Sequence, residues 1–212
     1  MIQRNDTMLT SYNTIQSNAA AETTERRSRF IASIARAERE EDAVNFINAL
    51  KKEHWNASHN VYAYILKEGS TARFSDDGEP QGTAGIPVLE VLKKEELTDV
   101  VMVVTRYFGG VLLGAGGLVR AYSKAAKAAV DAAGRIDVSL CKTVHITTDY
   151  TLHAKAQSAV YANGGKIADT EFAENVRITA FVRHDKVRTF TAQITDETSG
   201  RAVIELGGDV WV

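Results

Sequence analysis

The sequence lacks the features that stabilise small secreted proteins or place a chain in a membrane. Cys141 is the only cysteine among the 212 residues, so no disulfide can form within the chain. No apolar run approaches the roughly 18 residues of a membrane-spanning helix, and the first residues, MIQRNDTMLTSYN, lack the apolar core of a secretory signal. No cysteines and histidines have zinc-ligand spacing. We therefore expect a cytoplasmic protein with no membrane association, no structural metal and no cofactor.

An excess of positive charge is also missing. The formal net charge is −2, and it is spread evenly: residues 1–137 carry 17 Lys and Arg against 18 Asp and Glu, and the remainder carries 8 against 9. A protein that coats nucleic acid by electrostatics alone has a strongly basic composition. Any surface that binds anions must therefore be local.

The first 137 residues mix strand and helix patterns. Strands are predicted at RSRFIASIA, with Phe30, Ala32 and Ile34 on one face, at 60–66, and at 100–105, which is apolar on both faces and so fully buried. Helices are predicted over 40–52, with Val44, Ile47 and Leu50 on the buried side, from about Pro87, and over 118–133. Residues 71–85 are predicted to be a loop.

The remaining residues follow a different pattern. The predicted order is a strand at KTVHITTDY, a helix over 151–163, strands over 165–172 and 175–183, a helix over 185–198 and a strand over 201–206. This β-α-β-β-α-β order is typical of the ferredoxin-like fold. We expect an α+β protein with an N-terminal domain over 1–137, including a polar extension over 1–7, and a C-terminal domain over 138–212. Met8 is a second candidate for the start of translation.

The segment RYFGGVLLGAGGLVRAYSKAA, residues 106–126, contains five glycines between a buried strand and a helix. It lacks the Lys-Ser/Thr of a phosphate-binding P-loop and the third glycine of a dinucleotide fingerprint. Glycines still allow close approach to the backbone, and the first amides of a helix attract anions. The plainer alternatives are close helix-to-sheet packing and a solvated basic face. The predicted anion or nucleic-acid site comprises Arg73, Arg106, Tyr107, Gly109, Gly110, Gly114, Gly116, Gly117, Arg120 and Lys124.

A second unusual segment, ARFSDDGEPQGTAG, spans residues 72–85. Asp76, Asp77 and Glu79 form a possible acidic site, for a divalent cation or for acid–base chemistry. The alternative is a rigid turn in which the aspartates accept hydrogen bonds from nearby amides. No residue is assigned as catalytic, and no residue is assigned as a metal ligand.

The segments ASHNVYAY (57–64), RFSDDGEPQGTAGIPVL (73–89) and VVTRYFGGVLLGAGGLVRAYSKAA (103–126) resemble the signature segments of the IMPACT family, in its bacterial YigZ-like branch. The resemblance extends from about Met8 to the end of the chain. It implies an N-terminal domain similar to domain 2 of ribosomal protein S5 and a ferredoxin-like C-terminal domain similar to domain V of elongation factor G.

The resemblance also carries expectations about function. Eukaryotic members are translational regulators, with an additional N-terminal partner-binding domain that has no counterpart in these 212 residues, so we do not carry over their partner. We expect a non-enzymatic binding protein whose partner is RNA, the ribosome or a translation-related protein. The alternative is a phosphate- or nucleotide-handling enzyme that uses the 76–79 acidic loop and the 109–117 glycine loop.

Overall fold

The computed structural model describes residues 10–67 and 70–212, so the predicted extension over 1–7 and Met8 lie outside the described residues. The chain divides into two compact units. The first comprises residues 12–137, and the second comprises 138–212 together with Thr10 and Ser11. Within the described part of the chain, no helix is long and apolar enough to cross a membrane.

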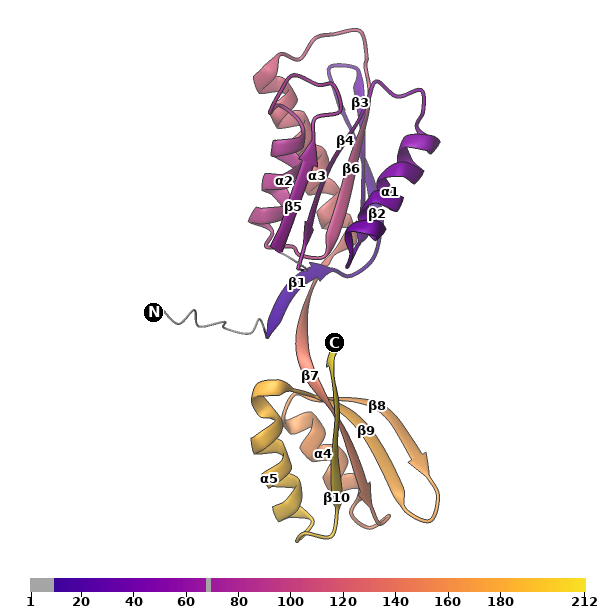
Figure 1. The fold of residues 1–212 in the computed structure, drawn as a ribbon, viewed down its shortest axis with the longest axis vertical. Coiled ribbons are helices and arrows are strands. Elements are labelled where there is room, and N and C mark those ends of the chain that lie inside the picture. Colours follow the sequence, from indigo (N-terminus) through magenta and orange to yellow (C-terminus); the bar gives the residue numbers. More distant parts are fainter. Residues whose placement is uncertain (1–9, 68–69) are drawn as a thin grey trace, which may run out of the picture. The chain divides into compact units, whose positions relative to one another are not determined.

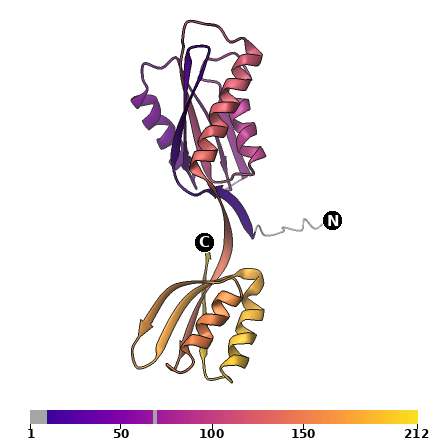
Figure 2. The ribbon, with the colours of Figure 1, turned by 180° about the vertical axis from the view of Figure 1, so that it is seen from behind.

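The first unit is built on one antiparallel sheet with two layers of helices. Its strands run in the order β2-β3-β6-β4-β5. They are β2 (Ala19–Glu25), β3 (Ser28–Arg36), β4 (His59–Leu66), β5 (Thr71–Ser75) and β6 (Val100–Tyr107). The helices α2 (Gly85–Lys94) and α3 (Ala115–Ala133) cover one face, and α1 (Glu40–Glu53) covers the other (Figures 1 and 2). The central strand β6 is therefore buried on both faces, as its apolar run predicts.

Alternation along β6 decides which side chains reach the candidate site. Met102 and Val104 belong to the core beneath α2 and α3, whereas Val101 and Val103 belong to the core beneath α1. Because successive side chains of a strand point to opposite faces, Arg106 continues the face of α2 and α3. Tyr107 continues the face of α1.

Two local predictions were wrong. The prediction of a loop over 71–85 fails at residues 71–75, which form the edge strand β5; Ala72 and Phe74 alternate there with polar residues, as in a half-buried strand. In α1 the fully buried positions are Ala43 and Ile47, while Val44 is 43% exposed. Ile47 and Leu50 pack against the core as predicted, and Ala43 takes the buried place that was predicted for Val44.

The second unit confirms the predicted ferredoxin-like fold. Its elements are β7 (Arg135–Thr148), α4 (His153–Ala162), β8 (Lys166–Phe172), β9 (Val176–Arg183), α5 (Val187–Glu197), which follows a short 3-10 turn, and β10 (Val203–Trp211). The strands lie in the antiparallel order β10-β7-β9-β8. The strand β1 (Ser11–Ile15) pairs with β7, but its residues 12–15 belong to the first unit, where Ile15 is part of the core. Apolar side chains of α4, α5 and the sheet form one core.

The unusual loops of the sequence come together at one end of the first unit. The turn between β2 and β3, the 76–84 loop and the 108–114 loop all lie at the end where β6 finishes and where α2 and α3 begin (Figure 1). The register of β3 against β6 places Arg29 opposite Tyr107, next to this end. Segments that are distant in the sequence therefore build one surface.

Candidate functional site

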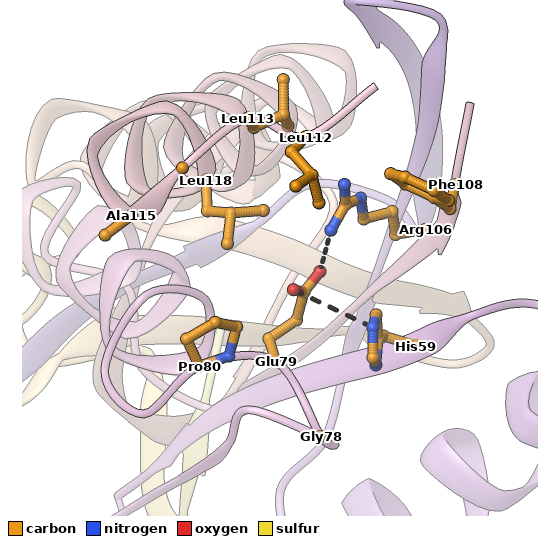
Figure 3. A pocket seen from close by; sticks show the side chains of 11 residues that line it. His59, Gly78, Glu79, Pro80, Arg106, Phe108, Leu112, Leu113, Ala115 and Leu118 are labelled. Atoms are coloured by element: carbon orange, nitrogen blue, oxygen red, sulfur yellow. Dashed lines mark hydrogen bonds and ion pairs between the residues drawn. The ribbon is translucent and has the colours of Figure 1, made fainter. Parts of the chain in front are cut away.

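A cavity of about 410 Å³ opens at this end of the first unit, between the 78–80 segment, the end of β6 and the start of α3 (Figure 3). Most of its wall is apolar, and its polar groups come from three side chains. The lining residues are His59, Gly78, Glu79, Pro80, Arg106, Phe108, Leu112, Leu113, Gly114, Ala115 and Leu118. This combination is typical of a site for a small ligand or for one group of a larger ligand.

A buried ion pair forms the polar wall of the cavity. Arg106 Nη1 lies 2.6 Å from Glu79 Oε1, and the two residues are only 5% and 8% exposed. The hydroxyl of Tyr122 donates to the same oxygen at 2.7 Å, and Arg106 Nη2 donates to Ser28 Oγ at 3.3 Å. Removing one partner of such a pair leaves an uncompensated buried charge. We therefore expect the pair to hold the 76–84 loop against β6.

Tyr122 comes from α3 and is fully buried beneath the cavity. Its ring packs edge-on against Phe30, with the ring centroids 5.2 Å apart. Burial, and then the negative charge of Glu79, raise the pKa of Tyr122 far above its usual range. The phenol therefore remains a hydrogen-bond donor to Glu79 at any physiological pH.

The face of the Arg106 guanidinium is covered by aromatic rings. Its central carbon lies 5.5 Å from the centroid of Phe30 and 5.4 Å from that of Phe108. Phe30 is fully buried, whereas Phe108 remains 47% exposed. Contacts of this kind stabilise a desolvated cation, and the outer side of Phe108 is left available to another molecule.

His59 lies beside Arg106 on the neighbouring strand β4, and the carboxylate of Glu79 faces both side chains (Figure 3). Its Nδ1 is 2.9 Å from the backbone oxygen of Asp77, and its Nε2 is 3.9 Å from Glu79 Oε2. Within residues 10–67 and 70–212, no three acidic, histidine or cysteine side chains are arranged to hold a metal ion.

The three acidic residues of the 76–79 segment have different environments. Asp76 accepts hydrogen bonds from the amides of Gly82, Ala84 and Gly85 at 2.8–3.1 Å, and so fixes the start of α2. Asp77 accepts from the amide of Asn60 and from Lys51 Nζ, both at 2.7 Å. Only Glu79 lines the cavity. The structure therefore does not bring the three carboxylates together as one acidic site, and it matches the rigid-turn alternative for the two aspartates.

The five glycines of the 109–117 loop also divide by role. A Cβ atom on Gly109 would lie 2.1 Å from the backbone carbonyl of Arg27, so this position needs glycine for packing. Gly110 and Gly114 have φ of 82° and 70°, and Gly114 begins α3 at the cavity. Gly116 and Gly117 lie in the first turn of α3. One glycine of the loop thus serves close packing, and another leaves the start of α3 open to the cavity.

The basic and aromatic residues predicted for this site do not form one group. Arg106 lines the cavity but is paired with Glu79, so it is not a free anion-binding group. Arg120 and Lys124 are exposed on α3 and do not line the cavity. Arg73 lies opposite Tyr64 on β5, on the face of α1, and Tyr107 Oη contacts His54 Nδ1 at 2.9 Å on that same face. The shared pocket predicted for these residues is therefore not what the structure shows.

Tyr122 is the functional residue that the sequence did not single out. It lies on the buried stripe of α3 with Leu118, Ala125 and Ala129. A buried tyrosine on an alanine-rich helix needs a partner for its hydroxyl. This need for a partner could have pointed to Tyr122 from the sequence alone, but it does not identify Glu79 as that partner.

The geometry defines a class of protein: a two-unit α+β protein with a partly apolar cavity and a buried ion pair at one end of its first sheet. A family model described as "Impact N-terminal domain" matches residues 26–130, and a second model, "Domain of unknown function (DUF1949)", matches residues 146–201. The chain belongs to the IMPACT family.

Similar proteins cover almost the whole chain. IMPACT family member YvyE of Bacillus subtilis is 39% identical over 201 residues, which are 94% of this chain and 93% of the relative. IMPACT family member YigZ of Escherichia coli is 33% identical, over 82% of this chain and 87% of the relative. A solved structure described as "Crystal structure of an hypothetical protein" is 28% identical, with a TM-score of 0.61 over 93% of this chain and 97% of that one.

Proposed function

We propose that this protein is a non-enzymatic binding protein that acts in the regulation of translation in the cytoplasm and binds RNA, including RNA of the ribosome. We further propose that RNA lies on the end of the first unit that carries Phe108 and the glycine loop. The observation that carries the proposal is a set of exposed basic side chains in the turn between β2 and β3 and along the first half of α3. We call these four side chains the cationic end: Arg26, Arg27, Arg120 and Lys124.

The cationic end has charge to offer to phosphates. All four side chains are exposed, and none of them forms an ion pair with another residue in the described part of the chain. The neighbouring Arg29, by contrast, pairs with Glu22 at 2.9 Å. Exposed, unpaired Lys and Arg side chains release counterions from nucleic acid when they contact phosphates, and this release drives binding. A chain of net charge −2 therefore still presents a local basic surface.

The glycine loop connects the two halves of the cationic end. Gly109 packs against the backbone of Arg27 in the turn between β2 and β3. At the other side of the loop, Arg120 Nη1 lies 3.8 Å from where a Cβ atom of Gly116 would be. Phe108 and Leu112 are 47% and 81% exposed within the same loop. Exposed aromatic rings beside unpaired cations suit the stacking of unpaired bases.

The family resemblance supports the proposed link to translation. Relatives that match about 43% of this chain include the "Protein IMPACT homolog" of Dictyostelium discoideum, which is 38% identical over 96 residues. The resemblance associates such proteins with translational control. The alternative of a phosphate-handling enzyme has less support, because Asp76 and Asp77 are occupied by structural hydrogen bonds.

Filter binding of structured RNA and co-sedimentation with ribosomes, each at several salt concentrations, test this proposal. The variant Arg120→Glu with Lys124→Glu is expected to lower affinity. With a single-stranded RNA it is expected to reduce the slope of log K against log salt by about 1.4, that is about 0.7 for each phosphate that the variant no longer neutralises. The control is Lys93→Glu with Lys94→Glu, which makes the same charge change at the opposite end of α2. Equal RNA binding by both variants and the unaltered protein would refute the proposed surface. Binding of a translation-related protein without any binding of RNA would refute the proposal that RNA is the ligand.

A further inference from the structure

We propose that the cavity beside Glu79 binds a single unstacked nucleobase, and that it selects bases carrying an exocyclic amino group. This inference rests on the proposed function, because we take the base to come from a single strand of bound RNA. The chemistry of the cavity itself stands apart from the cationic end, because none of the four cationic side chains lines it.

The size and the wall of the cavity suit a flat heteroaromatic ring. Its volume of about 410 Å³ lies near the lower end of the roughly 300–1,000 Å³ found for small-molecule sites. Leu112, Leu113 and Leu118 contribute apolar wall, and Phe108 stands at the edge with about half of its surface exposed. RNA-binding proteins hold unstacked bases by stacking them on aromatic rings and by hydrogen bonds to their polar edges.

Glu79 offers one acceptor to such an edge. Its Oε1 already accepts from Arg106 and Tyr122, at 2.6 and 2.7 Å. Its Oε2 lies 3.9 Å from His59 Nε2, which is beyond hydrogen-bond distance, and none of the described residues donates a hydrogen bond to it. A carboxylate oxygen accepts from an amino group such as that of cytosine. Uracil and hypoxanthine present a carbonyl oxygen at the corresponding position, and two acceptors repel each other.

The network around Glu79 keeps this oxygen in place. The Arg106 guanidinium is held by Ser28 and by the rings of Phe30 and Phe108, and the Tyr122 hydroxyl is fixed on α3. Rigid support of a polar group favours specificity, because little ordering is needed when the ligand binds.

The start of α3 provides a place for the sugar–phosphate that follows the base. Gly114 and Ala115 line the cavity, no side chain caps this helix, and a Cβ atom on Gly114 would meet nothing within 4 Å. The first amides of a helix lack partners within the helix and attract phosphate. A base in the cavity would therefore leave its phosphate beside these amides, with the RNA strand continuing towards the cationic end.

The unaltered protein tests the selection directly. Calorimetric titration with AMP and IMP compares two purines that differ at the amino group, and titration with the octanucleotides A8, C8 and U8 repeats the comparison in RNA. We expect AMP to bind roughly 10-fold more tightly than IMP, and A8 and C8 roughly 10-fold more tightly than U8. Equal affinities within both series overturn the inference.

Two variants place the selection at the cavity. Glu79→Gln keeps an acceptor for Arg106 and Tyr122 but turns an N–H group towards the cavity, so the preference for AMP over IMP is expected to disappear or reverse. Phe108 is half-exposed, so Phe108→Ala is not expected to cause misfolding. This variant should lower the binding affinity for every base roughly 10-fold. Trp55→Ala is the matched control, since Trp55 is 81% exposed in the same unit and does not line the cavity. A preference that survives Glu79→Gln in a folded protein refutes the assignment.

The outcomes separate this inference from the proposed function. RNA binding with no base preference leaves the proposed function standing and refutes the base pocket. Selective binding of AMP over IMP without any RNA binding supports the pocket and refutes RNA as the source of the base.

Discussion

Replacing Glu79 by alanine is expected to destabilise the first unit more than any single change at an exposed position. The substitution removes the one carboxylate among the described residues that pairs with Arg106, at 2.6 Å, and the acceptor of the Tyr122 hydroxyl, at 2.7 Å. The guanidinium would remain about 95% buried, with Ser28 as its one remaining hydrogen-bond partner in the described part of the chain. Breaking a buried ion pair in this way costs about 3–5 kcal/mol of the free energy of unfolding.

Urea unfolding measures this loss, with hydrogen exchange in β6 as the readout. The exchange readout is needed because the two units can unfold separately, and a single two-state transition is then not expected. The triple variant Glu79→Leu, Arg106→Met and Tyr122→Phe removes both charges and the hydroxyl that needs Glu79 as its acceptor. It is expected to recover most of the lost stability, since apolar replacements of buried ion pairs are often neutral. A loss below about 1 kcal/mol in Glu79→Ala would show that the guanidinium is not buried as described.

Three further predictions concern the surroundings of the cavity. Gly109→Ala, whose Cβ would lie 2.1 Å from the Arg27 carbonyl, is expected to lower the free energy of unfolding by about 1–3 kcal/mol; a melting temperature that does not fall would contradict the close approach. Asp76→Ala is expected to cost about 1–2 kcal/mol and to speed amide exchange at the start of α2, and unaltered exchange there would argue against its capping role. The folded pKa of Tyr122 lies above its unfolded value near 10, so its stabilisation is complete below pH 10 and declines as the pH rises. Tyr122→Phe should therefore make the fall in stability above pH 10 shallower by up to about 1.4 kcal/mol per pH unit, and identical slopes in urea titrations would refute the buried phenol.

The sequence predicts most of the elements because their signals are local. The apolar run of β6 identifies a buried central strand, and Gly134, with φ of 69°, ends α3 where a C-terminal glycine is expected. The strand β5 is missed although Ala72 and Phe74 alternate with polar residues, because the pattern spans only 5 residues and adjoins the turn-forming segment DDGEP.

The candidate site is predicted only in part because its chemistry depends on long-range partners. Asp76, Asp77 and Glu79 are almost adjacent in the sequence, yet their roles are set by α2, by Asn60 and by Arg106. Local spacing does not distinguish them. Alternation along β6 does predict that Arg106 and Tyr107 face opposite ways, which would have separated these two residues of the predicted site.

Mapping the RNA contact on the folded protein tests the central claim most directly. Hydrogen exchange of the whole chain is measured with and without a saturating single-stranded RNA of mixed sequence. We predict slower exchange over 108–118 and in the turn between β2 and β3, with no change in β10. Slower exchange confined to residues 138–212, with the glycine loop unaffected, would contradict the claim.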